Sequence, residues 1–265
     1  MTPPVAAVIV NYRTKALTRA AAASALAQPE VAEVVVVDNG SGDGSAGYLR
    51  NTLADSRVAV VEAGHNRGFG QGVNLGVGRT CAPLLLVLNS DATVMPGAVA
   101  VLVDALTADE GVGVVAPAIY SADGRSLQPT AYGRLPTRRD ILLGRWSRSS
   151  PDETAPEWVS GVAMIVRRED FIGVGGFDPR FEMYFEDLDL CRRLREQGKV
   201  ARRAPSAAVV HIGGKSWQSR TDQRECFQRS KAAYFQNIGA TALELQYVRL
   251  LKRVRTGSLR RRTQA

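Results

Sequence analysis

The amino-acid sequence predicts an α/β protein with a mostly parallel central sheet that is flanked by helices. Short runs rich in Val and Ile alternate with Ala-, Leu- or Gly-containing segments of helical length, as expected when a helix follows each strand of a parallel sheet. The runs contain almost no polar residue, which is typical of strands buried on both faces. The chain has 265 residues and 45% hydrophobic content, enough for a sizeable core.

The predicted strands come first along the chain. They lie at residues 5–10, 34–37, 58–61, 84–88 and 112–115. Residues 121–157 are rich in Pro, Arg, Ser and Asp, and their poor periodicity predicts a long loop. The remaining predicted elements are a strand over 158–168, a helix from 185, a strand over 207–212, and two helices near 222–237 and 241–255.

Polar sequence follows four successive predicted strands. The segments are Asn11-Tyr12-Arg13, Asp38-Asn39-Gly40-Ser41, Gly64-His65-Asn66-Arg67-Gly68 and Asn89-Ser90-Asp91. Ligands of open α/β sheets bind beyond the carboxyl ends of the strands. One polar strand end is an ordinary turn, whereas four that face one crevice indicate a binding site.

Two adjacent carboxylates, Glu186 and Asp187, lie at the start of the helix predicted from residue 185. A helical projection places Asp187 within the apolar face and Glu186 on the opposite side. A carboxylate on a buried face is costly unless it has partners or a function, so Asp187 is either a catalytic base or a structural group. Asp189 and Arg193 are four residues apart and predict a surface ion pair.

Asp91 and His211 both follow apolar runs, and His211 is one of two histidines in the chain. Carboxylate and imidazole groups suit Mg²⁺ or Mn²⁺ when a diphosphate supplies further oxygens. The alternative is that His211 is an ordinary hydrogen-bonded residue at a strand end.

Taken in order, seven segments make the chain resemble the inverting family 2 glycosyltransferases of the GT-A fold, and within them rhamnosyltransferase-like members. These segments are VIVNYR, VVVVDNGSGDGS, NRGFGQGVNLGV, LLLVLNSDATV, WVSGVAMIVRRE, GGFDPRFEMYFEDLDLCRR and VVHIGGKS. The resemblance implies a Rossmann-like GT-A domain over residues 1–238, with a nucleotide-binding half (1–120) and an acceptor half (121–238).

The resemblance also implies roles for individual residues. The donor nucleotide would be bound by Asn11, Tyr12, Arg13, Asp38, Asn66, Gly68, Asn74, Asn89 and Asp91, and the acceptor by Trp158, Ser160 and Gly161. Asp187, in its Glu186-Asp187 pair, would deprotonate the acceptor, and Asp91 with His211 would hold Mg²⁺ or Mn²⁺. The chain departs from the family at Asn89, where an acid is expected, and this predicts weaker metal binding.

The function implied is transfer of rhamnose from dTDP-rhamnose, with UDP-sugars left open, to a glycan or polyprenyl-diphosphate-linked saccharide in cell-envelope polysaccharide synthesis. Two alternatives stay open. A nucleotidyltransferase would carry a Gly-rich basic loop after its first strand, and a non-catalytic nucleotide-sugar-binding module would not require Asp187.

The net charge of +8 comes from the end of the chain. Seven of the 34 Lys and Arg residues follow Glu244, and the other 27 balance 26 Asp and Glu, so a broad nucleic-acid surface is not expected. Residues 239–265 predict a basic amphipathic helix and tail that binds an anionic membrane surface, with Leu243, Tyr247, Leu250, Leu251 and Val254 on its apolar face and Arg249, Lys252 and Arg253 opposite. The alternative is that its apolar face packs on the protein.

The location expected from sequence is the cytoplasm, at the inner face of the plasma membrane. The N-terminus has no basic region before its apolar run, which argues against a signal peptide. Three cysteines without a CxxC pattern indicate ordinary buried thiols in a reducing compartment.

Overall fold

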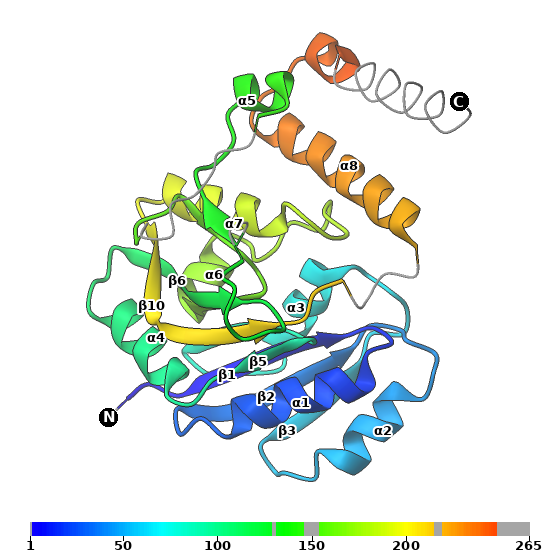
Figure 1. Ribbon diagram of the computed structural model, residues 1–265, viewed down its shortest axis with the longest axis vertical. Coiled ribbons are helices and arrows are strands. Elements are labelled where there is room, and N and C mark those ends of the chain that lie inside the picture. The colour runs from blue at the N-terminus through cyan, green and yellow to red at the C-terminus, as the bar shows by residue number, and fades with distance from the viewer. Residues whose placement is uncertain (1, 129–130, 146–153, 215–218, 248–265) are drawn as a thin grey trace.

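The computed structural model of the chain describes residues 2–128, 131–145, 154–214 and 219–247. Within these residues the protein forms an eight-stranded mixed sheet with helices on both faces and a separate pair of short strands (Figure 1). The strands are β1 Val5–Asn11, β2 Val31–Asp38, β3 Val58–Glu62, β4 Leu84–Asn89, β5 Ala92–Val94, β6 Val112–Tyr120, β7 Tyr132–Gly133, β8 Trp158–Val159, β9 Ala163–Arg167 and β10 Val200–His211. The helices are α1 Lys15–Leu26, α2 Ser45–Thr52, α3 Phe69–Val77, α4 Ala98–Thr107, α5 Arg138–Leu143, α6 Arg168–Gly173, α7 Glu186–Glu196 and α8 Arg220–Asn237.

The predicted mostly parallel sheet is confirmed. The strand order is β3-β2-β1-β4-β9-β6-β10-β5, and β3, β2, β1 and β4 are mutually parallel. The strand β9 runs antiparallel between β4 and β6, and the short β5 pairs antiparallel with β10 at the edge. The carboxyl ends of β1, β2 and β4 therefore lie side by side, as the polar segments after these strands predicted.

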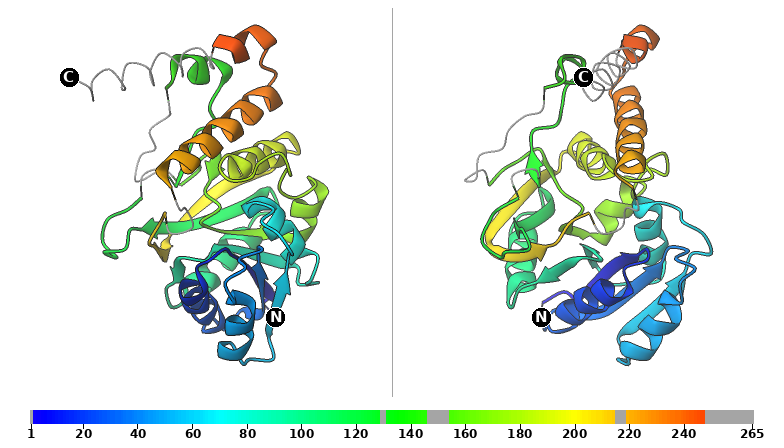
Figure 2. Two further views of the ribbon diagram at one scale, coloured as in Figure 1. Left: turned by 90° about the vertical axis from the view of Figure 1, so that its right-hand side faces the viewer. Right: turned by 45° about the vertical axis from the view of Figure 1, so that its right-hand side comes forward.

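Alternate residues of the central strands pack on opposite faces of the sheet. On β1, Ala7 and Ile9 join a buried cluster with α1 and α4, whereas Ala6 and Val8 join another with α3 and α7. Burial on both faces explains why these runs lack polar residues. Figure 2 shows α8 standing against the yellow-green segment that contains α7, away from the blue strands of the first half.

The strand β10 changes register against β6 between Ala204 and Ala208, where the chain passes through Pro205. Proline removes a backbone donor and is tolerated in a sheet at such irregularities. Beyond this point β10 bends across the end of the sheet and pairs with β5, so that His211 lies opposite Ala92 (Figure 1). This bend carries His211 to the end of β4.

The second half departs from the elements predicted for it. The expected loop 121–157 contains β7 and α5, which begins with a capping box formed by Thr137 and Asp140. The single strand expected over 158–168 is two strands, β8 and β9, with a turn at residues 160–162. Residues 242–247 are helical, and Leu250, Leu251, Val254, Arg249, Lys252 and Arg253 lie outside the described residues. A domain boundary at residue 238 stays a prediction.

Two further predictions from the sequence concern membrane spans and the burial of the cysteines. In the part of the chain that is described, no helix is both long and apolar enough to cross a membrane. Cys191 and Cys226 are buried as expected, and burial raises the pKa of the Cys226 thiol to about 11. The expectation was wrong for Cys81, which is exposed because it lies in the turn that precedes β4.

Candidate functional site

The ends of β1 and β2 form one buried polar cluster. Asn11 lies opposite Asp38 in the sheet register, and its Nδ2 donates to Asp38 Oδ1 at 2.6 Å. The Ser41 hydroxyl donates to the same oxygen at 2.5 Å and accepts from Asn11 Nδ2 at 3.0 Å. Asp38 Oδ2 receives a single contact at 3.4 Å, from the Ser41 N–H, within the described residues. One carboxylate oxygen is thus fixed by the protein, and the other retains capacity for a ligand donor.

Arg13 adopts a left-handed backbone conformation, with φ of 58°, directly after this cluster. Its N–H donates to Ser41 Oγ at 3.0 Å and its Nε to the Ser41 carbonyl at 3.2 Å. The guanidinium carbon lies 5.1 Å from the centre of the Tyr12 ring. Non-glycine residues with positive φ are uncommon and need support from their surroundings. Ser41 supplies that support, although the sequence assigned it no role; its position three residues after Asp38 was the available signal.

The loop between β3 and α3 is joined to the end of β2 through Asn39. Its Nδ2 donates to Asn66 Oδ1 at 3.0 Å and to the Gly68 carbonyl at 3.1 Å. Gly68 has φ of +85°, and a Cβ there would lie 2.3 Å from the Glu182 carbonyl oxygen. Only glycine fits this position, so the loop can approach the turn before α7. The polar groups of Asn66 and Gly68 thus organise the loop beside the strand ends.

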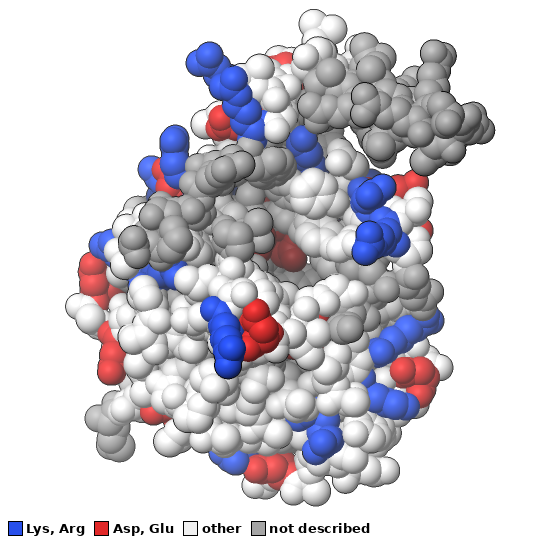
Figure 3. Space-filling view, viewed as in Figure 1, with Lys and Arg blue, Asp and Glu red and all other residues white. Residues whose placement is uncertain are grey.

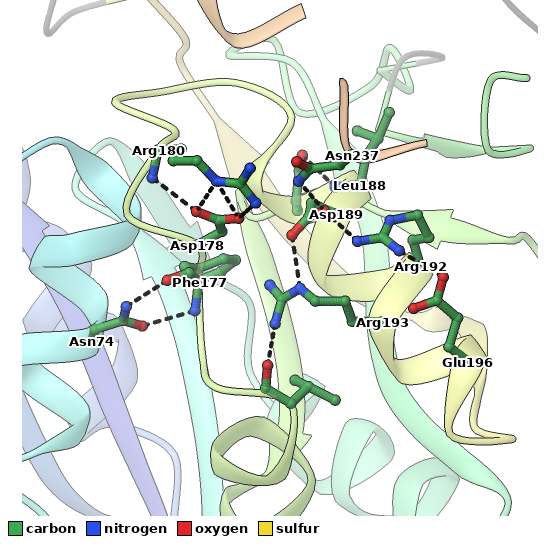
Figure 4. Close-up of polar contacts among 12 residues, drawn as sticks. Asn74, Phe177, Asp178, Arg180, Leu188, Asp189, Arg192, Arg193, Glu196 and Asn237 are labelled. Carbon is green, nitrogen blue, oxygen red and sulfur yellow. Dashed lines mark hydrogen bonds and ion pairs between the residues drawn. The ribbon is translucent and has the colours of Figure 1, made fainter. Parts of the chain in front are cut away.

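Asn74 lies deeper along α3. Its Nδ2 donates to the Phe177 carbonyl at 2.7 Å, and its Oδ1 accepts from the Phe177 N–H at 2.9 Å (Figure 4). These contacts connect α3 to the segment between α6 and α7. Asn74 therefore fixes the backbone at Phe177 relative to α3, and its part in donor binding stays a prediction.

The structure brings Asp91 and His211 together, as predicted for a metal pair. Asp91 Oδ1 lies 3.2 Å from His211 Nε2, and Asn89 Nδ2 lies 3.4 Å from the same nitrogen. On its other side, His211 Nδ1 lies 3.1 Å from Gln128 Oε1, an arrangement that orients the ring and leaves Nε2 facing the acid. The Gly213 N–H donates to Asp91 Oδ2 at 3.0 Å.

This donor set fits a divalent cation that also takes oxygens from a substrate. No cluster of three or more His, Cys, Asp or Glu side chains able to hold a metal occurs among the described residues. Asp91 and His211 form a pair, and Asn89 contributes an uncharged amide. A site with two protein ligands depends on further oxygens, and Mg²⁺ commonly combines one or two carboxylates with substrate phosphates.

Asp187 lies in the first turn of α7. Its Oδ2 accepts from the Gly161 N–H at 3.0 Å, and its Oδ1 accepts from the Leu188 N–H at 2.9 Å. Burial raises the pKa of Asp187 above its ordinary value, against the backbone hydrogen bonds, which lower it. A raised pKa makes this carboxylate a stronger base when it is ionised.

The turn at residues 160–162 connects Asp187 to the end of β4. The Asn89 N–H at the end of β4 donates to the Val162 carbonyl at 2.8 Å, and the neighbouring Gly161 N–H binds Asp187. Ser160 shares this turn, and Trp158 precedes it in β8, partly buried between two hydrophobic clusters. Figure 3 shows a hollow near the centre of one face with acidic side-chain atoms inside it.

The orientation predicted for Glu186 was wrong. Glu186 is buried, and a Cβ built at Gly70 of α3 would lie 3.7 Å from Glu186 Cβ. Its Oε2 has no hydrogen-bond partner among the described residues, and burial, followed by the charge of Asp187, raises its pKa well above the usual value. The projection considered one helix alone, whereas α7 begins in contact with α3.

The ion pair predicted between Asp189 and Arg193 is present, but its predicted place on the surface was wrong, because Asp189 is fully buried. Its carboxylate accepts hydrogen bonds from Arg192 at 2.9 Å, Arg193 at 2.7 Å and Asn237 at 2.9 Å (Figure 4). Asn237 comes from the end of α8, which covers this side of α7. The cluster therefore ties the helix that carries Asp187 to α8.

The turn before α7 is the most strained backbone of the site. Tyr184 and Phe185 have φ values of 71° and 69°, and bulky residues rarely adopt this conformation. The Ser230 hydroxyl of α8 donates to the Met183 carbonyl at 2.7 Å, and the ring centres of Phe185 and Phe227 lie 5.2 Å apart. Contacts from α8 thus hold the turn that presents Glu186 and Asp187.

A mostly parallel sheet with polar residues at neighbouring strand ends, and an acid pair at the start of α7, is the arrangement of a glycosyltransferase of the GT-A fold. The mannosyltransferase PcManGT from Pyrobaculum calidifontis, solved in complex with GDP-Man and Mn²⁺, superposes with a TM-score of 0.65 at 18% identity, covering 93% of this chain and 69% of that one. Residues 6–173 match the family described as glycosyl transferase family 2. The chain belongs to this family.

Two curated relatives narrow the comparison. The N-acetylglucosaminyl-diphospho-decaprenol L-rhamnosyltransferase of Mycobacterium tuberculosis is 32% identical over 226 residues, covering 74% of this chain and 71% of that protein. Succinoglycan biosynthesis protein ExoU of Rhizobium meliloti is 31% identical over 239 residues, covering 85% and 68%. The resemblance predicted from sequence is confirmed, and a glycosyltransferase is favoured over a nucleotidyltransferase or a non-catalytic module.

Proposed function

We propose that the protein is an inverting glycosyltransferase that moves rhamnose from dTDP-rhamnose to a saccharide or lipid-linked saccharide during cell-envelope polysaccharide synthesis. One observation carries the proposal. The turn at 160–162 joins the base candidate Asp187 to the strand end that bears Asn89 and Asp91. The rhamnosyltransferase name of the mycobacterial relative supports the choice of donor sugar.

The donor nucleotide lies across the ends of β1 and β2 in this proposal. Asp38 is buried and keeps Oδ2 largely available, so it can accept a hydrogen bond from N3 of a uracil or thymine ring. Tyr12 and the backbone of Arg13 follow directly on β1 and line the same strand ends. A base that lacks an N–H at this position, such as cytosine, would leave Asp38 without its partner and is therefore disfavoured.

The diphosphate is assigned to the end of β4. Asp91 and His211 would hold Mg²⁺ or Mn²⁺ there, with Asn89 beside them. The chemistry supplied by such a cation is neutralisation of charge on the departing nucleoside diphosphate. Gln128 orients the His211 ring, and the Gly213 N–H orients Asp91.

Transfer is a single displacement in this proposal. Asp187 takes the proton of the acceptor hydroxyl, and the oxygen bonds to the anomeric carbon. The bond from that carbon to the diphosphate breaks on the opposite side, and the nucleoside diphosphate leaves with the electron pair. The anomeric configuration is inverted. Hydrogen bonds from Gly161 and Leu188 hold both Asp187 oxygens in place for this step.

The acceptor approaches from the side of Trp158, Ser160 and Gly161. Leu243 and Tyr247 are exposed at 76% and 48%, so residues 239–265 are proposed to lie on an anionic membrane surface and to bring a polyprenyl-diphosphate-linked acceptor to the site. The location proposed is therefore the inner face of the plasma membrane. Leu245 packs instead against the cluster around α8, which anchors the start of this segment.

A donor and acceptor panel tests the proposal. Purified protein is mixed with dTDP-rhamnose or UDP-sugars and with acceptors that include an N-acetylglucosaminyl-diphospho-lipid, with and without EDTA. We expect transfer from dTDP-rhamnose, loss of transfer in EDTA, and restoration by Mg²⁺ or Mn²⁺. NMR coupling constants of the product should show inversion. Retention of configuration, or transfer from other donors alone, would contradict the proposal.

A further inference from the structure

A second pocket lies beside the turn that precedes α7. It has a volume of about 200 Å³ and is lined by Tyr184 of the turn and by Gln223, Arg224, Phe227 and Gln228 of α8. The four α8 residues fall on one face of the helix, since they are spaced one and four apart. Pockets for drug-sized ligands occupy about 300–1,000 Å³, so this one suits a single small ring.

The lining combines aromatic rings with amide groups. The rings of Tyr184 and Phe227 pack edge to face with centres 5.6 Å apart, and Gln223 Nε2 donates to the Tyr184 hydroxyl at 2.8 Å. Aromatic faces pack against the C–H groups of a sugar, and amides can both donate to and accept from its hydroxyls. This composition favours a saccharide over an apolar ligand.

Arg224 adds a positive charge at the edge of the pocket. It is exposed, and within the described parts of the chain it forms no ion pair. Guanidinium groups bind carboxylates and phosphates through paired hydrogen bonds. Figure 3 shows Lys and Arg side chains over the α8 side of the hollow. The charge favours a sugar that carries an anionic group.

The pocket lies close to the proposed base. Tyr184 precedes Asp187 by three residues, which limits the separation of their Cα atoms to about 11 Å. In Figure 1 the turn lies beneath the first half of α8, and the Met183 carbonyl accepts from Ser230 on that helix. A saccharide in the pocket is therefore within reach of an acceptor chain bound at Asp187.

A larger cavity, of about 730 Å³, lies over the far half of α7 next to α5. Three of the four arginines in its lining have carboxylate partners, and Arg139 forms no ion pair within the described residues. Arg138 pairs with Glu244, and Arg195 pairs with Glu157. Arg192, on the same wall, pairs with Asp189 and Glu196. The charge of that cavity is largely neutralised within the protein, so the smaller pocket is the stronger candidate for an anionic sugar.

We propose that Tyr184, Phe227, Gln228 and Arg224 form an acceptor subsite that binds a sugar ring bearing an anionic substituent. This inference rests on the proposed function, because it assigns the pocket to the acceptor of the same reaction. It extends that function by placing acceptor selection on α8, outside the Trp158–Gly161 segment.

Binding can be measured without turnover. Saturation-transfer NMR titrations use N-acetylglucosamine 1-phosphate and the uncharged methyl N-acetylglucosaminide. We expect the wild-type protein to bind the phosphate-bearing sugar more tightly. Gln228→Ala should weaken both ligands about five- to tenfold, as expected for one lost hydrogen bond. Arg224→Ala should remove the preference for the phosphate and leave the methyl glycoside unaffected.

The controls lie on the same helix. Gln236→Ala and Arg220→Ala remove the same side-chain types at exposed positions outside the pocket lining and should change neither affinity. The inference is overturned if the wild-type protein binds neither sugar, or if the pocket variants bind like the controls. Neither outcome bears on transfer from dTDP-rhamnose, which the donor and acceptor panel tests. Failure of the subsite and failure of the proposed function can therefore be told apart. Melting curves confirm that each variant is folded.

Discussion

The proposed donor half (residues 1–120) and the proposed acceptor half (residues 121–238) of this glycosyltransferase hold their polar groups by different means. In the donor half, Asn11, Asp38 and Ser41 bind one another side chain to side chain at neighbouring strand ends. In the acceptor half, Asp187 is held by backbone N–H groups, and its helix is held by α8. The first arrangement depends on the register of a rigid sheet, and the second on the packing of helices far apart in sequence.

The family match extends past the boundary between the two halves. It covers residues 6–173, which include the first half and the second half through α6, and it ends before α7 and β10. The proposed base and His211 lie beyond it. A sheet that binds a shared class of nucleotide donor imposes similar strand ends, whereas the acceptor side can change with the acceptor. A substitution in the donor half should therefore mainly change the donor KM, and a substitution in the acceptor half should mainly change kcat.

The largest effect is expected from Asp187→Asn. Removing a general base typically costs about 10²–10⁴-fold in rate, and the amide keeps the shape of the side chain. We expect kcat to fall by that factor while the donor KM holds. In the wild-type protein, burial raises the pKa of Asp187, so kcat should fall as the pH drops through this raised value. Steady-state kinetics across pH would check the kcat of the variant and the pH dependence of the wild-type protein. Glu182→Gln, at an exposed position, is the control. Turnover of Asp187→Asn near that of the wild type would exclude Asp187 as the base.

Asp189→Ala should have the next largest effect. It removes the buried partner of Arg192, Arg193 and Asn237, and breaking a buried charge pair costs about 3–5 kcal/mol. For a protein of this size that corresponds to a fall in Tm of at least about 6 °C. Glu196→Ala, which removes the exposed partner of the same Arg192, should change Tm by less than about 2 °C. If kcat at low temperature is unchanged in Asp189→Ala, the hydrogen bonds of Asp189 are not needed to position the base.

The two halves also differ in how far the sequence predicted them. Strand periodicity and the polar residues after each strand predicted that Asn11, Asp38 and Asp91 would gather at one sheet edge, because parallel strands require it. The approach of His211 to Asp91 depends on the bend of β10, for which the sequence offered only Pro205 as a signal.

The errors in the predicted site residues lie on α7. A helical projection assumes one buried face, but α7 contacts α3 at its start and α8 further along. Glu186 and Asp189 are therefore buried on sides that the projection assigned to solvent. Partners more than 45 residues away, such as Asn237 for Asp189, leave no local pattern in the sequence.

Ser41→Ala tests the donor half. The hydroxyl contacts Asp38, Asn11 and the Arg13 N–H, so its loss removes three hydrogen bonds from the cluster and leaves the Arg13 N–H without its side-chain acceptor. Such a loss costs about 1–3 kcal/mol, and we expect the donor KM to rise about tenfold with kcat nearly unchanged. Ser126→Ala, in an exposed turn, serves as the matched control. A fall in kcat with an unchanged donor KM would contradict the expectation that the donor half mainly controls donor binding.

The smallest effect is expected from Glu186→Gln, and its sign depends on pH. Burial and the charge of Asp187 raise the pKa of Glu186, so the folded protein favours its neutral form. The stability that neutral Glu186 contributes is fully present below its unfolded pKa of about 4.3 and is lost as the pH rises toward the folded value. Glutamine is always neutral, so the variant should match the wild-type Tm at pH 4 and exceed it by about 3 °C at pH 8. Glu182→Gln, at an exposed position, should show no such trend, and a lower Tm for Glu186→Gln at pH 8 would mean that Glu186 functions as a buried anion.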